Sequence, residues 1–536
     1  MHLATLATLA PLLFSTCAGH VTQSRLHDPS CTRTTVAVLG GGMAGVTAAQ
    51  ALANASMHDF IIVEYRDTLG GRVWHTEFGQ GPDGQPWVIE YGANWSRRAD
   101  REQIQGLGSE NAANPVWTLA NKYGLKNTYS DYDSILTYNE TGYTDYSHLL
   151  NEYSAASERA SERAGSILND NIQDMTARSG LALAGWRPRR DDMAAQAVEW
   201  WNWDWEGAYT PETSSFVFGV ASENLTFNQF GDKNNLVLDR RGYSAIIQGE
   251  ANTFLHRNDS RLRLNTRVTD IEYGPGGVIV RNSDGSCISA AYAICTFSLG
   301  VLQNDAVNFT PSLPDWKQTA IAKFNMGTYT KIFMRFNETF WPDDTQFFLY
   351  ADPTTRGYYP VFQSLSTDGF LPGSNIIFVT VVQDQAYRAE RQSDEQTKRE
   401  VLEVLQKMFP DKRIPDPIAF TYPRWSTEPW AYGSYSNWPA GTTLEMHQNL
   451  RANVDRLWFA GEAMSAQYFG FLHGAWFEGR EAGMNVAALL HDECVSIYGV
   501  ETCGARKHYD VLHGTTPAAA YTVANGWTAN STTIQA

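Results

Sequence analysis

The chain has 536 residues, which is too long for one hydrophobic core, so we expect two domains. Its 58 acidic residues outnumber its 41 basic residues and give a formal net charge of −17. This balance argues against nucleic acid as a partner, because binding to phosphates requires a basic face. An acidic protein can instead concentrate small cations, although acidity also serves solubility alone.

Residues 1–18 have the features of a secretory signal peptide. Residues 3–14 are apolar, and Thr16-Cys17-Ala18 offers small residues for cleavage. The apolar run falls short of the ~20 residues that a membrane-spanning helix needs, so we expect no membrane partner. Eight N-x-[S/T] sequons also fit secretion, although Asn94 lies in a segment that we expect to be buried. We therefore predict a secreted, extracellular glycoprotein.

Residues 34–54 predict a buried strand, a glycine-rich turn and a helix. Gly40, Gly42 and Gly45 form G-x-G-x-x-G directly after the apolar residues 35–39, and an Ala-rich segment follows. Glycine at these three places permits a sharp turn, the close approach of a pyrophosphate, and tight packing of the helix on the strand. The pattern predicts a dinucleotide site and leaves open which dinucleotide binds there.

The start of this helix and the end of the next strand complete the predicted nucleotide site. The helix N-terminus offers unpaired N–H groups to phosphates, so we include Met43 and Ala44 in the site. The second strand, residues 60–63, ends on Glu64, which lies 19 residues beyond Gly45. A carboxylate at this spacing accepts hydrogen bonds from ribose hydroxyls.

Two further motifs follow, at Gly70-Gly71-Arg72 and at Gly92-Ala93-Asn94-Trp95. The first supplies a tight turn and a planar cation, which suits a second approach to the phosphates. The series GxGxxG, Glu, GGR and G-A-x-W resembles the fingerprint of the flavin-dependent amine oxidases. The resemblance implies FAD rather than NAD. The alternative, a nicotinamide dehydrogenase, would lack the GGR segment.

Beyond a charged, aperiodic loop over residues 97–113, the composition becomes helical from 115 to 228. Residues 154–175 and 191–203 predict helices, and the second runs into the cluster Trp200-Trp201-Asn202-Trp203-Asp204-Trp205-Glu206. Such a cluster is typical of core packing. Because Glu206 is an acid among aromatic rings, it could also bind a cation or have a raised pKa.

Residues 264–271 and 291–296 predict strands on either side of a hairpin, and residues 327–336 predict a further strand. In that last strand Tyr329 and Lys331 share one face. From the pattern alone, such a lysine extends to the edge of the sheet. Ser393 begins a capping box for a helix that ends at Met408.

Near the C-terminus, residues 456–462 predict a strand that ends at Glu462, and Gly470-Phe471 precedes a helix to Leu490. We expect the tail, residues 505–536, to be disordered. Without Cys17 five cysteines remain; Cys494 and Cys503 could pair, the other connectivity stays open, and one thiol is left free. Neither a CxxC motif nor a histidine cluster indicates a metal site.

We predict an α/β fold with a doubly wound, Rossmann-type FAD-binding domain from residues 34–114, 229–315 and 424–500. An α+β substrate-binding domain of mixed sheet and helices, residues 115–228 and 316–423, is interleaved with it. The span 34–500 resembles the secreted plant-type polyamine oxidases of the monoamine oxidase superfamily. The motifs that carry this resemblance include Phe297–Leu302, Pro423-Arg424-Trp425, Tyr435–Pro439 and Phe459–Glu462.

The resemblance implies roles for single residues. Lys331 would hold a water against flavin N5, Glu206 would supply the acid, and Tyr435 and Phe471 would flank the substrate. Tyr329 matches the tyrosine two positions before the lysine. For the cofactor the resemblance implies contacts from Gly71, Arg72, Val268 against the adenine, Trp425, Glu462 on the ribityl chain, Gly470 and Phe471.

The resemblance also implies a reaction of polyamine catabolism. A hydride equivalent passes from the carbon beside the amine to flavin N5, the imine hydrolyses to an aldehyde and an amine, and O2 reoxidises the flavin to give H2O2. We expect a monomer that takes a small-molecule amine and O2 as partners. Because residues 434–437 contain no cysteine, the resemblance implies FAD that is bound non-covalently.

One departure leaves the substrate open. The plant enzymes carry an acid shortly after G-A-N-W, whereas this chain reads Ser96-Arg97-Arg98, with no acid before Asp100. A realigned loop could still bring Asp100 or Glu102 to that position. We expect spermine or spermidine as the substrate. The alternative is an L-amino acid, whose carboxylate Arg97 would bind bidentately. A flavoprotein without activity is a third alternative, and it is disfavoured because the expected cofactor, lysine and aromatic positions are all occupied.

Overall fold

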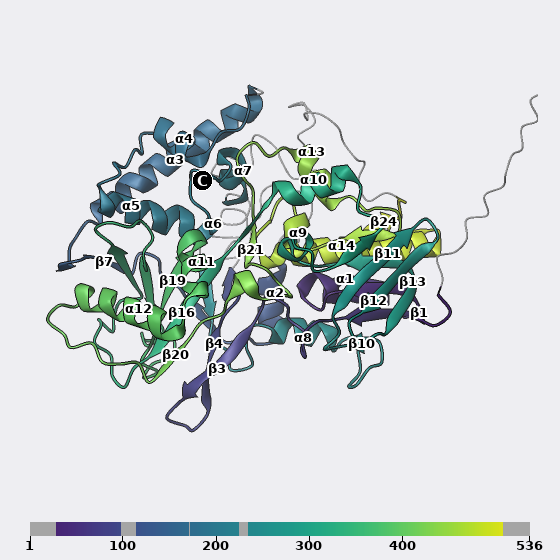
Figure 1. Cartoon of the computed structure of the whole chain (residues 1–536), viewed down its shortest axis with the longest axis horizontal. Helices are drawn as coiled ribbons and strands as arrows, with labels where there is room; N and C mark the ends of the chain where they lie inside the picture. The colour runs from purple at the N-terminus through teal and green to yellow at the C-terminus, as the bar shows by residue number, and fades with distance from the viewer. Residues whose placement is uncertain (1–27, 98–113, 171, 224–233, 507–536) are drawn as a thin grey trace, which may run out of the picture.

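The computed structural model describes residues 28–97, 114–170, 172–223 and 234–506. The predicted signal peptide, most of the predicted loop 97–113 and nearly all of the predicted tail 505–536 lie outside these residues. Figure 1 shows two larger sheets toward opposite ends of the long axis of the molecule.

The first sheet has eight strands in the order β10-β2-β1-β13-β12-β11-β14, with β22 paired to β13. Its centre is parallel, because β1 pairs in parallel with both β2 and β13. The predicted buried strand is confirmed, since Val36 to Leu39 are fully buried. The strands are β1 (Thr32–Leu39), β2 (Phe60–Val63), β10 (Leu262–Arg263), β11 (Val268–Gly274), β12 (Gly277–Asn282), β13 (Cys287–Cys295), β14 (Asn308–Thr310) and β22 (Leu457–Phe459).

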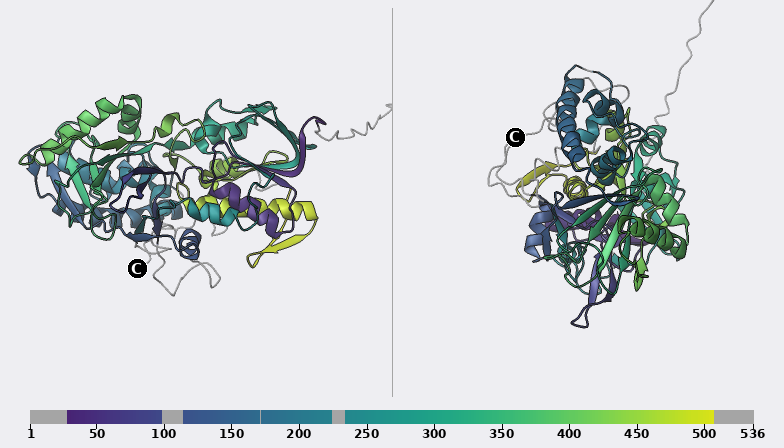
Figure 2. Two further views of the ribbon diagram at one scale, coloured as in Figure 1. Left: turned by 90° about the horizontal axis from the view of Figure 1, so that it is seen from below. Right: turned by 90° about the vertical axis from the view of Figure 1, so that its left-hand side faces the viewer.

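Helices α1 (Met43–Asn54) and α14 (Leu472–His491) lie side by side along this sheet (Figure 2). Small residues allow the two helices to approach closely. A Cβ atom at Gly479 would overlap the Ala44 carbonyl oxygen, and one at Gly483 would overlap the Ala48 carbonyl oxygen. The N-terminal glycine-loop helix is therefore held by the C-terminal helix.

The second sheet has seven strands in the order β20-β16-β19-β18-β17-β7-β8. Helix α12 (Asp394–Met408) begins where the sequence predicts, and the Ser393 hydroxyl oxygen accepts a hydrogen bond from the Gln396 N–H at 3.3 Å. The strands are β7 (Ile135–Asn139), β8 (Gly142–Tyr143), β16 (Tyr329–Arg335), β17 (Phe347–Ala351), β18 (Val361–Ser364), β19 (Ile376–Val382) and β20 (Ala419–Thr421).

A group of helices covers one end of this second sheet (Figure 1). They are α3 (His148–Asn169), α4 (Ala177–Leu183), α5 (Met193–Glu199), α6 (Trp205–Gly207) and α7 (Phe216–Glu223). The helix predicted over 191–203 is interrupted, because Trp200–Asp204 forms a π-helical turn between α5 and α6. The Arg356 guanidinium stabilises this turn by donating hydrogen bonds to the carboxylates of Asp204 at 2.7 Å and Glu199 at 3.0 Å. Such turns are frequent at functional sites.

Smaller elements complete the fold. The short strands are β3 (His75–Gln80), β4 (Pro86–Glu90), β5 (Trp95–Arg97), β6 (Asn127–Tyr129), β9 (Asn234–Val237), β15 (Asn325–Gly327), β21 (Tyr435–Asn437), β23 (Cys494–Ile497) and β24 (Val500–Cys503). The other helices are α2 (Pro115–Lys122), α8 (Ala245–Ala251), α9 (Leu299–Gln303), α10 (Asp315–Lys323), α11 (Gln383–Arg391) and α13 (Leu444–Arg451).

Every strand of the first sheet comes from the segments predicted for the FAD domain, and every strand of the second from those predicted for the substrate domain. The division into two domains remains a prediction.

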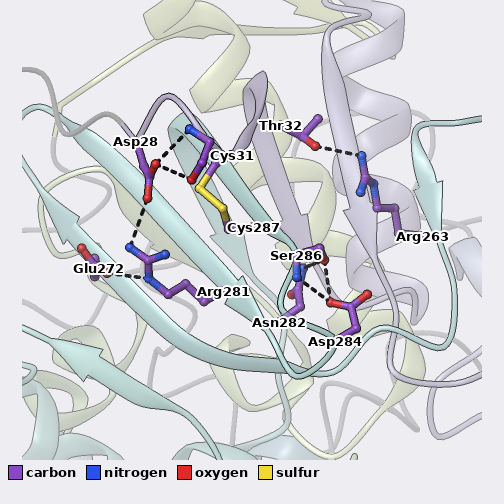
Figure 3. The surroundings of a disulfide bond; sticks show 11 residues. Asp28, Cys31, Thr32, Arg263, Glu272, Arg281, Asn282, Asp284, Ser286 and Cys287 are labelled. Carbon is purple, nitrogen blue, oxygen red and sulfur yellow. Dashed lines mark hydrogen bonds and ion pairs between the residues drawn. A yellow bond between two sulfur atoms is a disulfide. The ribbon is translucent and has the colours of Figure 1, made fainter.

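Two disulfides are present in the described residues. Cys494 pairs with Cys503, which confirms the possibility drawn from the sequence, and Cys31 pairs with Cys287. Figure 3 shows how the second bond joins the segment before β1 to the start of β13; an ion pair between Arg281 and Asp28 at 3.4 Å lies beside it. Cys295 keeps a free, buried thiol. None of the described helices is both long enough and apolar enough to cross a bilayer.

Candidate functional site

One cavity of about 370 Å³ joins the glycine loop to the aromatic and acidic residues of the helical layer. This volume is typical of sites for small ligands. Nearly all residues predicted for the site line this cavity: Gly40, Gly42, Met43, Ala44, Glu64, Gly71, Arg72, Glu206, Val268, Tyr329, Trp425, Tyr435, Glu462, Gly470 and Phe471. Of the predicted site residues, Gly45 and Lys331 are absent from the lining.

The three glycines of the loop have three different environments. Gly40 has a φ of +113°, and a Cβ atom there would collide with the Thr296 hydroxyl. A Cβ atom at Gly45 would overlap the Gly40 carbonyl oxygen, so this glycine allows α1 to pack on the loop. Gly42 faces open space, with the Gly71 Cα atom 3.8 Å away as its nearest neighbour. A side chain at Gly42 would therefore occupy the cradle that a pyrophosphate needs.

The start of α1 is suited to an anion. Gly42 is its N-cap residue, so no side chain accepts from the first N–H groups, and the first turn holds no acid. These N–H groups and the helix dipole favour phosphate. Glu64 accepts from the Gly41 N–H at 2.6 Å and from the Arg66 N–H at 2.8 Å. Its burial raises its pKa, while these backbone donors oppose that shift.

Residues from both ends of the chain meet at the second glycine turn. The Nη1 nitrogen of Arg72 donates to the Glu462 carboxylate at 2.8 Å and to the Ser434 carbonyl at 2.9 Å. The other Glu462 oxygen accepts from the Ser436 hydroxyl at 2.6 Å and from the Gly470 N–H at 2.8 Å. Arg72, β21 and the turn before α14 are thus connected through one buried carboxylate.

Aromatic rings form the wall beside this network. Trp425 is buried, and its ring meets those of Trp74 and Trp430 edge to face at 5.7 Å and 5.6 Å. The Arg66 guanidinium lies 4.8 Å from the Trp430 ring centre and covers the cluster. The wall is consequently rigid and apolar, as a flat heteroaromatic ring would require.

The residues predicted to contact the substrate lie farther along the cavity. The Tyr435 hydroxyl donates to the Glu206 backbone carbonyl at 2.8 Å, which fixes the ring beside the acid. The Tyr329 and Tyr435 rings are 5.9 Å apart. Phe471 stacks on His473 at 5.3 Å. The structure thus brings Glu206, both tyrosines and Phe471 to one cavity, while their roles in a reaction remain predictions.

Lys331 lies just behind the cavity wall. Its ammonium donates to the Gly92 carbonyl at 2.6 Å, and Gly92 lines the cavity. Lys331 is buried within β16 instead of extending to an edge of the sheet, as the strand pattern alone would predict. Burial lowers the pKa of Lys331 to about 7, although the nearby Glu90 carboxylate opposes this shift.

Glu90 is a buried acid that the sequence did not indicate as functional. One oxygen accepts from the Tyr243 N–H at 2.6 Å, and the other has no hydrogen-bond partner within the described part of the chain. Burial raises the pKa of Glu90 to about 7, against the attraction of Lys331. The sequence could have indicated that Glu90 is buried, because this acid ends the apolar strand Trp87-Val88-Ile89 and burial of the strand also buries its last residue.

Several cavity residues were not predicted, and some predicted residues cannot be placed. Asn202, Ser222, Glu223 and Asn437 also line the cavity. Their spacing places Gly219, Ser222 and Glu223 on one helix face, but no local pattern marks that face as the one that lines the cavity. The side chain of Arg97, and all of Arg98, Asp100 and Glu102, lie outside the described residues. Asn94 is 4% exposed, so this asparagine is buried, as expected.

Comparisons with known proteins agree with this geometry. Residues 43–487 match the family described as flavin containing amine oxidoreductase. The chain is 36% identical to polyamine oxidase 1 of Zea mays over 491 residues, which cover 88% of this chain and 93% of that protein. It is also 36% identical to polyamine oxidase 7 of Oryza sativa subsp. japonica over 464 residues, 83% of this chain and 93% of that protein.

The fold has a counterpart among solved structures. Putrescine oxidase, in a structure with bound putrescine, superposes with a TM-score of 0.64 over 85% of this chain and 100% of that chain, at 16% identity. At this identity the similarity supports the fold alone. Because the family match covers residues 43–487, well over half of the chain, the chain belongs to the flavin-containing amine oxidoreductase family and is a flavin-dependent amine oxidase.

Proposed function

We propose that the protein is a secreted, monomeric polyamine oxidase that binds FAD non-covalently and oxidises spermine or spermidine. The observation that carries the proposal is the single cavity, which joins a dinucleotide cradle to aromatic rings and the acid Glu206. The net charge of −17 and the names of the maize and rice relatives support a cationic amine substrate.

The residues of the cavity fit FAD. The start of α1 and Gly42 would hold the pyrophosphate, and Glu64 would hold a ribose. The ribityl side of the cofactor would lie along Glu462, and the ring against Trp425. Cys295, the free thiol in the described residues, is buried in β13 and does not line the cavity, which supports non-covalent binding. When bound, the flavin accepts a hydride equivalent from the amine and passes two electrons to O2.

The side chains of this protein would prepare the amine for that reaction. Tyr435 and Phe471 would orient the reacting carbon and exclude bulk water. Glu206 would attract the cationic substrate and can accept a proton, since the reacting nitrogen must be neutral. Lys331, with a pKa of about 7, can hold or release a proton near neutral pH and would position a water. That water would be available for hydrolysis of the imine product.

An oxygen-electrode screen tests the substrate. Spermine, spermidine, their N-acetyl forms, simple monoamines and the twenty L-amino acids would be supplied to the purified yellow protein. We expect turnover of spermine or spermidine with release of H2O2, and loss of this turnover in Glu206→Gln. Turnover of amino acids but of no polyamine, lost in Arg97→Ala, would contradict the proposal and indicate an L-amino acid oxidase. A flavin that no amine reduces would indicate a protein without oxidase activity.

The remaining parts of the proposal have separate tests. Acid precipitation should release the flavin into the supernatant, whereas a coloured pellet would indicate a covalent bond. Two disulfides support an oxidising compartment and therefore secretion, which recovery of the protein from culture medium would test. Light scattering on the eluting peak of a sizing column should give the mass of one chain if the protein is a monomer; that mass is 59.8 kDa before the signal peptide is removed and glycans are added.

A further inference from the structure

Two helical segments form one wall of the cavity. Helix α7 contributes Gly219, Ser222 and Glu223 to this wall. The neighbouring π-helical turn and α6 contribute Trp203 and Glu206. The two segments touch, because a Cβ atom at Gly219 would lie 3.0 Å from the Trp203 ring. The cavity wall therefore carries two carboxylates on different segments.

The end of β21 adjoins the same wall. Trp438, directly after Asn437, packs on Phe218 of α7 with ring centres 4.7 Å apart. The Asn437 amide N–H donates to the Gly207 carbonyl at 3.2 Å, which fixes how the amide is oriented. The amide oxygen of Asn437 has no partner among the described residues, and neither has the Ser222 hydroxyl. Both residues are more than nine-tenths buried and line the cavity.

Unsatisfied polar atoms in the cavity lining are mostly oxygens. Besides Ser222 and Asn437, the amide oxygens of Asn94 and Asn234 lie in the lining without a hydrogen-bond partner in the described chain, and so do two groups that can donate, the Trp203 indole N–H and the Tyr329 hydroxyl. A buried acceptor without a donor destabilises the protein, because it has lost its hydrogen bond to water. A ligand that brings several N–H donors would remove that cost. Ammonium groups do so, whereas a carboxylate would add acceptors.

We infer that Glu223, with Ser222 and Asn437, forms a second subsite that binds the distal ammonium group of a diamine or polyamine. This inference rests on the proposed function, in which the reacting amine lies near Glu206, Tyr435 and the flavin. Glu223 lies on α7, outside the segment after G-A-N-W, and no sequence pattern indicated it. A carboxylate here strengthens N–H contacts to a charged amine and repels an amino acid carboxylate.

Glu223→Gln tests the subsite, because it keeps the shape and removes the charge. We expect kcat/KM for spermine to fall about tenfold, a loss of ~1.4 kcal/mol, with kcat nearly unchanged. A secondary monoamine such as N-butylpropylamine, which keeps the carbon chains on either side of one secondary amine but has no distal ammonium, should change less than about twofold. Ser222→Ala should lower kcat/KM for spermine in the same selective way, because it removes an acceptor from the subsite.

Glu158→Gln is the matched control, since Glu158 is an exposed acid of α3, on the outer surface and not in the cavity lining. It removes the same charge from the same region and should leave both substrates unaffected. Unchanged kcat/KM for spermine in Glu223→Gln, or an equal fall for spermine and the monoamine, would overturn the subsite while the oxidase stands. A wild-type protein that oxidises amines but no polyamine would overturn the proposed substrate and the subsite together.

Discussion

Glu90→Gln should shift the titration of Lys331. The two groups are buried, and the negative charge of Glu90 raises the pKa of Lys331, which burial lowers to about 7. Glutamine keeps an oxygen for the Tyr243 N–H and removes the charge. An opposite charge nearby moves a pKa by about 1–3 units. Because Glu90 itself has a pKa of about 7 and is only partly ionised there, the pKa of Lys331 should fall from about 7 by about one unit, the low end of that range.

Stopped-flow reduction of the flavin by a saturating amine, from about pH 5 to about pH 9, measures this change. The wild-type rate should show a limb near pH 7 that Lys331→Met abolishes, with the flavin still bound and its reduction much slower. Glu90→Gln should move that limb to lower pH by about one unit. Glu77→Gln is the control, because Glu77 is an exposed acid on the neighbouring strand β3.

The pH dependence of flavin reduction shows whether Glu90 and Lys331 are electrostatically coupled. The substrate amine also titrates, but it contributes the same limb to every variant. Glu90 itself titrates near pH 7, and Lys331→Met, which keeps Glu90, shows any limb that belongs to this acid. A profile of Glu90→Gln that superposes on the wild-type profile within about 0.3 pH units would refute the electrostatic coupling. A shift to higher pH would have the wrong sign, because loss of a negative neighbour can only disfavour the protonated lysine.

Three other predictions concern the cofactor site and the disulfides. Gly45→Val, whose side chain would overlap a backbone carbonyl, should abolish flavin binding as measured by visible absorbance after desalting. Gly274→Ala, where an added Cβ atom would meet nothing within 4 Å, should retain it. Glu462→Gln should weaken flavin affinity about tenfold in a fluorescence titration, since it breaks a mostly buried ion pair. Loss of the Cys31–Cys287 bond, which spans 256 residues, should lower the free energy of unfolding by ~5.5 kcal/mol, because the bond closes a long loop in the unfolded chain. Loss of the Cys494–Cys503 bond, which spans nine residues, should lower it by ~2.6 kcal/mol. Equal denaturant midpoints for the two double-serine variants would contradict this difference.

The nucleotide loop could be predicted from sequence because local geometry restricts which residues fit. Gly40 needs a positive φ, Gly45 needs contact with a carbonyl, and Gly42 must leave the cradle open. Each requirement falls within one strand–turn–helix unit, so the spacing alone identifies it. The same holds for the buried strand Val36–Leu39 and for the cap at Ser393.

Glu90 and Glu223 could not be identified in this way, because their environment is set by distant parts of the chain. Glu90 matters through Lys331, which lies 241 positions later. Glu223 faces the cavity because α7 packs on Trp203 and Trp438. The π-helical turn likewise depends on Arg356, a residue of another segment, so helical periodicity alone predicted an uninterrupted helix.

The ion pair between Arg72 and Glu462 limits how early the cofactor site can form during synthesis of the chain. The two residues are 390 positions apart, and a ribosome adds roughly 5–20 residues each second, so Arg72 waits on the order of 20–80 s for its partner. Throughout that interval α1 also lacks α14, and its glycine-facing surface stays uncovered. The cofactor can therefore be enclosed only after the C-terminal helix has left the ribosome. A chain that terminates before residue 462 would expose the side of α1 that α14 covers in the complete protein to chaperones and proteases.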